Sequence, residues 1–280
     1  MFMAKIAKYR GGVAALLPVY NEEGRIRYVL DSLKWCEEVL LLDKRSTDHT
    51  VLIARQYPNV RVLFMENADA YSPTDISMLY RECRYKYSML VTASDIIHPL
   101  LSEEIRRLIN EKEFDYDAIE VPYKGFFLGI YEKYSPWYEE RDIKIVKTAC
   151  VSIKEGSIHN SRSFSIKTIY KITSKDPDVA YYHLTHESAR GIIDRHSRYW
   201  KGEASSPESL SAPLRIVIRG TIKFLLFKRT FFKGPAAIAL AFSFLSYYMM
   251  TYLCKWDYLY GNTDLIYNNL RYKILYSRKR

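Results

Sequence analysis

Short apolar runs alternate with amphipathic segments over the first 110 residues, and this alternation constrains the fold more than any other feature. Each apolar run is too short for a buried helix of ordinary length and is typical of a buried strand. The runs comprise residues 13–19, 38–43, 60–65 and 87–92. Alternating strands and helices predict an α/β fold, built on an open and mostly parallel sheet that is flanked by helices.

The segments between these runs carry signals of helix starts. The polar segment 21–23 (NEE) can cap a helix that extends to Leu33, because apolar residues recur there at helical spacing. We expect a second helix over Thr47–Gln56. A third is expected over Ser102–Asn110, with Ser102 as its cap and two glutamates in its first turn.

Two polar segments follow the first two strands and are expected to form a binding site. Ligands of open parallel sheets bind beyond the carboxyl ends of the strands, where residues 18–23, 43–48 and 92–95 fall. Asp43 ends a buried strand, so its carboxylate can accept hydrogen bonds from a base edge or from ribose hydroxyls. Helix capping explains the polar residues of the second segment one by one, but not both segments at this spacing. The two segments together indicate a nucleotide-sugar site, with Asp48 shaping the second loop.

After about residue 116 the pattern changes to short strands and loops. The segment 205–212 has the composition of a linker. We therefore divide the chain into a catalytic domain over residues 11–204 and a C-terminal region over residues 205–280. The domain would comprise a nucleotide-sugar half, residues 11–115, and an acceptor half, residues 116–204.

The positive charge of the chain is concentrated in its C-terminal third. The net charge is +10, and residues 190–280 hold 16 Lys and Arg against 5 Asp and Glu. Basic residues are interleaved with apolar ones over residues 214–233, as in helices that lie on anionic membranes. The uncharged stretch 234–254 is long enough to span a bilayer, but it can also form an interfacial, re-entrant or core helix. We expect this region to contact a membrane surface.

Composition disfavours several other partners and compartments. Apolar residues among the basic ones suit a bilayer better than a phosphate backbone, so no nucleic-acid partner is expected. The four cysteines lie far apart without a Cys-x-x-Cys spacing, which predicts neither a zinc site nor a disulfide framework. Residues 1–12 lack the apolar core of a signal peptide, so we expect the protein at the cytoplasmic face of a membrane, held peripherally or by one helix.

The sequence resembles family 2 glycosyltransferases of the GT-A fold, and within them the branch that adds glucose or heptose to the lipopolysaccharide inner core. The resemblance is carried by Pro18–Glu23 (PVYNEE) and Asp43–Thr50 (DKRSTDHT). It continues through Gly125–Gly129, Ile143–Lys147, His183, Arg195–Ala204 and Phe231–Gly234. It implies a GT-A-like, Rossmann-like domain that binds a nucleotide-sugar donor and transfers the sugar with inversion.

The resemblance assigns the donor site to residues at three strand ends. The nucleotide sugar would contact Pro18, Tyr20, Asn21, Glu22, Asp43, Lys44, Arg45, Asp48, Thr92 and Ser94. The family's Asp-x-Asp motif and the acid after it fall on Thr92, Ser94 and Asp95, so hydroxyls replace two carboxylates. A Mg²⁺ or Mn²⁺ cofactor would be bound by Asp95, although such hard cations prefer several carboxylate oxygens. We therefore expect Lys44 and Arg45, which replace the Ser-Gly of the family motif, to substitute partly for the metal.

An inverting transfer needs a base for the proton of the acceptor hydroxyl. The family's later His-Glu pair falls on His159 and Asn160, which makes His159 the candidate base. Glu139, Asp142 and Glu187 are alternatives that the sequence cannot rank.

Three further side chains have assigned or excluded roles. Lys144 falls where the family usually has Arg and could face a phosphate as a point charge. His183 and His186 have a zinc-like spacing, but no third ligand accompanies them and no zinc site is expected.

Taken together, these features predict a hexosyl- or heptosyltransferase-like enzyme of polysaccharide biosynthesis. It would move a sugar from a nucleotide-sugar donor to a lipid-linked or cell-envelope glycan. Because several acids are missing, the alternative is a non-catalytic nucleotide-sugar-binding relative, or a scaffold of a glycan-assembly complex.

Overall fold

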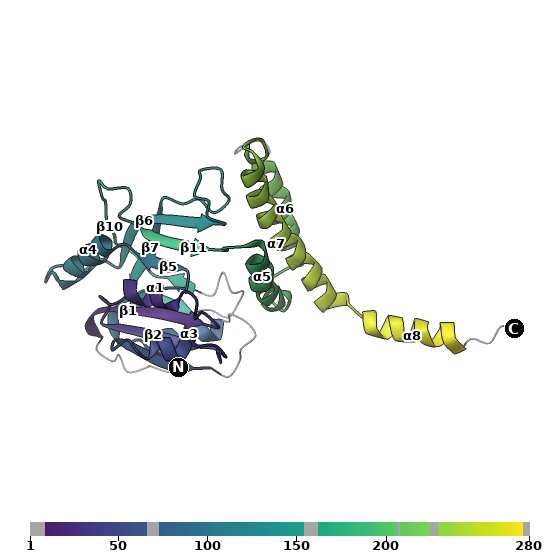
Figure 1. The fold of residues 1–280 in the computed structure, drawn as a ribbon, viewed down its shortest axis with the longest axis horizontal. Coiled ribbons are helices and arrows are strands. Elements are labelled where there is room, and N and C mark those ends of the chain that lie inside the picture. The colour runs from purple at the N-terminus through teal and green to yellow at the C-terminus, as the bar shows by residue number, and fades with distance from the viewer. Residues whose placement is uncertain (1–8, 66–72, 154–161, 207, 225–228, 277–280) are drawn as a thin grey trace.

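A computed structural model of the protein describes residues 9–65, 73–153, 162–206, 208–224 and 229–276. It shows a mixed sheet with helices on both faces, which confirms the predicted α/β class (Figure 1). The strand order is β3-β2-β1-β4-β7-β6-β11-β5, and β10 pairs with β6. These strands are β1 (Arg10–Val19), β2 (Glu38–Asp43), β3 (Val60–Phe64), β4 (Tyr85–Leu90), β5 (Asp95–Ile97), β6 (Ala118–Phe127), β7 (Arg141–Lys147), β10 (Ile169–Lys171) and β11 (Tyr181–Thr185). A separate pair is formed by β8 (Val151–Ile153) and β9 (Arg162–Phe164).

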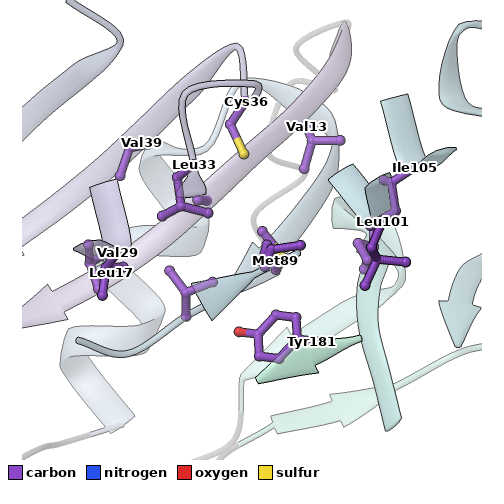
Figure 2. Packing of buried hydrophobic residues seen from close by; sticks show 14 of the residues in the cluster. Val13, Leu17, Val29, Leu33, Cys36, Val39, Met89, Leu101, Ile105 and Tyr181 are labelled. Atoms are coloured by element: carbon purple, nitrogen blue, oxygen red, sulfur yellow. The ribbon is translucent and has the colours of Figure 1, made fainter. Parts of the chain in front are cut away.

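Successive side chains of β1 point to opposite faces of the sheet and so enter two different cores. Val13 and Leu17 pack with the helices α1 (Ile26–Ser32) and α4 (Pro99–Asn110). Figure 2 shows this core, to which α1 contributes Val29, Leu33 lies beside that helix, and the ring of Tyr181 is supplied by β11. Ala14 and Leu16 pack on the other face, against Leu79 of α3 (Pro73–Glu82) and against Cys83, which follows that helix. Both faces of β1 are therefore buried, as the continuous apolar run predicts.

Three helix starts differ from the sequence predictions. α1 begins at Ile26 rather than after residues 21–23, because Asn21 has a left-handed backbone (φ 53°) and its side chain bonds to the next loop. α2 (Thr50–Ala54) is shorter than expected at both ends. α4 begins at Pro99, where the ring of His98 accepts the N–H of Leu100, so Ser102 lies within the helix and does not cap it. The elements α3 and β5 were not predicted.

The short strands expected after residue 116 are present and join the parallel half through an antiparallel connection. β7 pairs antiparallel with β4 and with β6, and β11 pairs parallel with β6. β11 also pairs antiparallel with β5, which places His183 opposite Asp95. A strand from residues 116–204 therefore reaches the edge of the part formed by residues 11–115.

The C-terminal part consists of helices: α5 (Ala189–Ala204), α6 (Ser211–Ile222), α7 (Pro235–Tyr260) and α8 (Thr263–Tyr276). α7 is long and apolar enough to cross a membrane, and about one third of its apolar window (33%) is buried inside the protein. That buried side packs against α5 and α6, and the indole N–H of Trp200 donates to the Tyr247 carbonyl (3.1 Å). Phe242 and Met249 are exposed on α7, and α8 continues away from the sheet (Figure 1).

Candidate functional site

The loops after β1 and β2 are joined by hydrogen bonds between the two predicted motifs. The N–H of Asn21 donates to the Ser46 hydroxyl (2.9 Å), and the N–H of Thr47 donates to the side-chain oxygen of Asn21 (2.8 Å). The N–H of Glu23 donates to the Asp48 carboxylate (3.0 Å). Asn21 and Asp48 therefore order the two loops against each other. Pro18 is buried in β1, beside Leu42 of β2.

Asp43 ends β2 with a carboxylate that is only 1% exposed. Its Oδ2 accepts the N–H of Ser46 (3.1 Å), whereas Oδ1 has no hydrogen-bond partner within the described residues. A buried carboxylate oxygen without a donor is costly, and such a group in a folded protein calls for an explanation. A ligand that donates a hydrogen bond at this strand end would satisfy it.

Lys44 does not lie where the sequence analysis expected. Its side chain is 4% exposed, and its ammonium is 2.7 Å from the Asp75 carboxylate of α3. The charge of Lys44 is thus used in a buried ion pair inside the fold, which removes the reason to assign it to a donor diphosphate. Arg45 is exposed and has φ 65°, a conformation that favours glycine, at the position where the family motif has glycine.

Left-handed backbone at non-glycine residues concentrates at the strand ends. Asn21 follows β1, Arg45 follows β2 and His186 follows β11, with φ of 53°, 65° and 57°. Such conformations cost free energy and persist where the surroundings over-determine them, which is common at functional sites. The backbone therefore supports the location that the motifs predict.

The third strand end holds the remaining family acid in a closed arrangement. Asp95 is 5% exposed; its Oδ2 accepts the N–H of Thr92 (2.6 Å) and its Oδ1 lies 2.6 Å from Nδ1 of His183. Burial by itself would raise the pKa of Asp95, but the hydrogen bond and charge of His183 outweigh burial and lower it. The hydroxyl of Thr92 accepts the N–H of Ser94 (3.3 Å).

These residues do not fit a divalent cation. Asp95 and His183 bind each other, and no group of three His, Cys, Asp or Glu side chains able to hold a metal occurs in the described ranges. Ser94 supplies a hydroxyl where the family motif has a carboxylate, and Mg²⁺ and Mn²⁺ prefer carboxylate oxygens. These residues, which have positively charged side chains nearby, are better suited to bind an anion than a metal ion.

Arg25, which the sequence analysis did not single out, places a cation at this point. Its Nη1 donates to the Ser94 hydroxyl (2.9 Å), and its Nε and Nη2 donate to the Glu22 carboxylate (2.5 and 3.0 Å). Glu187 lies 3.7 Å away. Burial by itself would lower the pKa of Arg25, but the bonds to Glu22 outweigh burial and raise it. The four residues line a cleft of about 590 Å³, together with Asn21, Gly24, Tyr28, Val29, Ala93, Ile96 and Leu184.

Helix α5 brings two more arginines to the same strand ends. Nη1 of Arg195 donates to the Thr185 hydroxyl (2.8 Å), and the guanidinium of Arg198 lies 5.5 Å from the ring centre of Tyr20. Neither arginine has a carboxylate within 4.0 Å among the described residues. Burial, and after it the positive charge of Arg25, lowers the pKa of Arg195. This part of the site is therefore rich in positive charge.

A second pocket, of about 310 Å³, lies beside β6 and β11. Its lining includes Tyr123, Trp137, Glu139, His183, Thr185 and His186. Partial burial, and then the charge of Asp142, raises the pKa of Glu139. A carboxylate with a raised pKa in a pocket is a suitable proton acceptor near neutral pH.

An aromatic pocket of about 140 Å³ adjoins the second pocket and shares Phe127, Trp137 and His186 with it. Residues of α7 close its other side, namely Phe244, Tyr247 and Tyr248. Nε2 of His186 lies 3.0 Å from Nε2 of His196, and burial lowers the pKa of His186 to about 3. His183 and His186 thus have different partners, Asp95 and His196 respectively.

The candidate bases have different surroundings. His159 lies in 154–161, outside the described residues. Glu187 belongs to the donor-side cleft, beside Arg25, and Asp142 lies 2.6 Å from the Lys144 ammonium. The same ammonium lies 4.4 Å from the ring centre of Tyr123, so Lys144 is already held by an acid and an aromatic face. Glu139 is the candidate that lines the second pocket.

Sequence reasoning missed Arg25, Arg195 and the pairing of Asp95 with His183. The spacing of Glu22 and Arg25 is a signal that could have been used, because residues three apart can pair at a helix start. The Asp95 and His183 side chains are 88 residues apart in sequence, and no local pattern predicts that contact.

Comparison with known proteins places these features in a family. The sequence model of glycosyl transferase family 2 matches residues 15–170, more than half of the chain. Among solved structures, S. aureus TarS 1–349 is similar at 15% identity and a TM-score of 0.45, over 89% of this chain and 92% of that chain. Its complex with UDP-GlcNAc has 14% identity and a TM-score of 0.47 over the same shares. Glucosyl-3-phosphoglycerate synthase from Mycobacterium tuberculosis, in complex with Mn²⁺, UDP and glucosyl-3-phosphoglycerate, has 22% identity and a TM-score of 0.31, over 42% of this chain and 44% of that chain.

Proposed function

Because the chain belongs to glycosyl transferase family 2, we propose that it transfers a sugar from a nucleotide-sugar donor to a lipid-linked or cell-envelope glycan, with inversion. Family membership gives the GT-A-like fold and glycosyl transfer from a nucleotide sugar as the class of activity. The donor would bind at the carboxyl ends of β1, β2 and β4. The acceptor would enter the pocket beside β6 and β11.

The observation that carries the donor assignment is the unpartnered Oδ1 of Asp43. A base N–H or a ribose hydroxyl can donate to this oxygen, which has no donor within the described residues. The bonded loops of Asn21 and Asp48 keep the strand ends in place before the ligand arrives. Such preorganisation lowers the entropic cost of binding.

The proposed reaction is a single displacement. The acceptor hydroxyl oxygen attacks the anomeric carbon on the face opposite the leaving group. The glycosidic C–O bond forms while the bond to the phosphate oxygen breaks, and that electron pair leaves with the nucleoside diphosphate. Glu139 would take the hydroxyl proton, because it lines the pocket next to His183 and its pKa is raised. Glu187 and Asp142 are already paired with Arg25 and Lys144.

Support for a lipid-linked acceptor comes from the position of the aromatic pocket. It shares Phe127 and Trp137 with the proposed acceptor pocket, and α7, the helix long enough to cross a membrane, closes its far side. Aromatic side chains with a polar edge suit the boundary between lipid and water. If the lipid of the acceptor binds at α7, the sugar of the same acceptor would reach Glu139. The enzyme would then work at the cytoplasmic face of the membrane.

A screen of nucleotide sugars by thermal stabilisation tests the donor assignment. A ligand present at 100 times its Kd stabilises the folded state by about 2.7 kcal/mol, which a melting curve resolves. We expect a uridine or guanosine diphosphate sugar to raise the Tm. Asp43→Ala should weaken its binding by about 1–3 kcal/mol, because a hydrogen bond to a buried carboxylate is lost.

The matched control is Asp31→Ala, which removes a carboxylate that lies in an exposed pair with Lys34 on α1. It should leave the affinity unchanged. Equal affinities of wild type and Asp43→Ala would remove Asp43 from the site. No response to any nucleotide sugar would contradict the proposed function.

A further inference from the structure

The nucleoside diphosphate that leaves in the proposed reaction needs a positive group beside it. Negative charge grows on the phosphate oxygen as the bond to the sugar breaks, and a fixed cation lowers the barrier. The hydroxyl of Ser94 stands where the family motif would place a carboxylate for a metal ion. That hydroxyl accepts a hydrogen bond from Arg25 at 2.9 Å.

Arg25 is held so that part of its guanidinium stays available to a ligand. A guanidinium has five N–H donors. Two of them bond to the Glu22 carboxylate and one to Ser94, which leaves two without a hydrogen-bond partner among the described residues. Glu22 holds the Arg25 guanidinium in one orientation and in its charged form, because the two carboxylate oxygens accept two hydrogen bonds from the planar guanidinium. The guanidinium lines the 590 Å³ cleft.

Arg195 adds a second positive charge, which has no ion-pair partner among the described residues. It bonds to the Thr185 hydroxyl and has no carboxylate within 4.0 Å in the described part of the chain. A buried guanidinium without a paired acid is unfavourable, so Arg195, close to the Glu22-paired Arg25, favours a bound anion at this strand end. Burial, and after it the charge of Arg25, lowers the pKa of Arg195, so the two guanidinium groups lie close enough to interact.

Asp95 is poorly placed to bind a metal ion. Both of its oxygens already accept hydrogen bonds, one from the Thr92 N–H and one at the ring of His183. A metal ion would have to displace one of these partners. The guanidinium of Arg25 needs no such rearrangement.

We propose that Arg25, anchored by Glu22 and Ser94 and supported by Arg195, neutralises the donor diphosphate in place of a divalent cation. This inference rests on the proposed function, because it presupposes a nucleotide-diphosphate donor. It replaces the expectation that Lys44 and Arg45 would do so, since Lys44 is engaged with Asp75. The chain then binds its donor equally well with and without metal.

Isothermal titration calorimetry of the full chain with UDP and GDP, and with uridine and guanosine, tests this. With excess EDTA or with Mn²⁺, the affinity of the wild type for the diphosphate should agree within about twofold. Arg25→Gln should weaken diphosphate binding by about 10- to 150-fold, the effect of losing a charged hydrogen bond. Binding of the nucleoside alone should not change, and Arg25→Lys should recover part of the loss.

Arg27→Ala is the matched control, because Arg27 is an exposed arginine of the same helix that bonds to Gln56. Melting curves of all variants report whether they fold. A rebuilt metal site gives a second readout, which would not change if Arg25 had only a structural role. In Arg25→Ala/Ser94→Asp, diphosphate binding should return only when Mn²⁺ is added.

The outcomes separate the inference from the proposed function. Wild-type binding that EDTA abolishes and Mn²⁺ restores would overturn the inference and leave the glycosyltransferase standing. Unchanged diphosphate affinity in folded Arg25→Gln would do the same. If neither nucleoside nor diphosphate binds the wild type under any condition, the donor site itself is wrong, and the inference falls with it.

Discussion

The sheet domain of residues 9–204 and the C-terminal helices α7 and α8 differ in how far their side chains find partners within the chain. In the sheet domain, several buried charges have partners within the chain, such as Lys44 with Asp75 and Asp95 with His183. In α8, apolar side chains such as Leu270 are exposed along the whole helix. Exposed apolar surface of this extent marks an interaction site. The difference teaches that the sheet domain is stable through its own contacts, whereas the tail is complete only against an apolar partner.

The largest expected effect tests whether the sheet domain depends on its internal pairs. Lys44→Ala removes one partner of a buried ion pair and leaves the charge of Asp75 in the interior. Such a change destabilises a protein by as much as about 3–5 kcal/mol. The free energy of unfolding in urea measures it.

Lys34→Ala is the matched comparison, since Lys34 pairs with Asp31 at the surface, where 64% of the lysine side chain is exposed. That variant should change the free energy of unfolding by less than about 1 kcal/mol. Similar losses for both lysines would show that burial does not distinguish the two pairs.

The next effect tests the tail. Leu270→Glu/Ile274→Glu places charges on exposed apolar positions of α8. Co-sedimentation with anionic phospholipid vesicles should fall by about tenfold for each side chain, because each loses its burial in the lipid. The Tm should not change, since neither residue is buried in the protein.

Asn268→Glu/Asn269→Glu adds the same charge at polar positions of the same helix and serves as the control. A weakening equal to that of the apolar pair would mean that charge repulsion alone governs binding. Unchanged sedimentation of the apolar pair would assign α8 to a partner other than a membrane.

A smaller effect is expected inside the donor loop. Arg45→Gly restores the residue type that φ 65° favours, and the backbone strain of the left-handed region is relieved. The free energy of unfolding should rise by up to about 1 kcal/mol, since greater freedom of glycine in the unfolded chain offsets part of the gain. A clear loss of stability would show that the Arg45 side chain makes contacts that hold the loop.

The smallest effect concerns pH. Glu139 must be ionised to accept a proton, so the rate should fall as the pH falls through its raised pKa. Asp142→Asn removes a negative charge that raises this pKa, so the acidic limb of kcat/KM should move to lower pH. Glu139→Gln should abolish the activity, and with it the acidic limb of the pH profile. An acidic limb that Asp142→Asn leaves in place would exclude Glu139 as the titrating base.

The parts of the fold that follow from local pattern were predictable from the sequence, and the parts that depend on distant contacts were not. The apolar runs located β1 to β4; β1 and β2 are buried almost throughout, whereas β3 is only partly buried. The start of α1 was misplaced because Asn21 bonds across to Thr47 instead of capping its own helix. The polar segments predict a site at these strand ends, but Lys44 was assigned to it without knowledge of its buried partner Asp75. The role of Arg25 depends on Ser94, 69 residues away.

The five residues of β11 connect three parts of the molecule. His183 holds Asp95 at the donor end, Thr185 bonds to Arg195, and the strand leads into His186 at the aromatic pocket. A shift of one residue in a strand turns every side chain to the opposite face. An insertion or deletion in β11 would therefore damage the donor end, the acceptor pocket and the contact with α5 in one mutational step. Single substitutions in β11, by contrast, keep the register and change one of these places at a time.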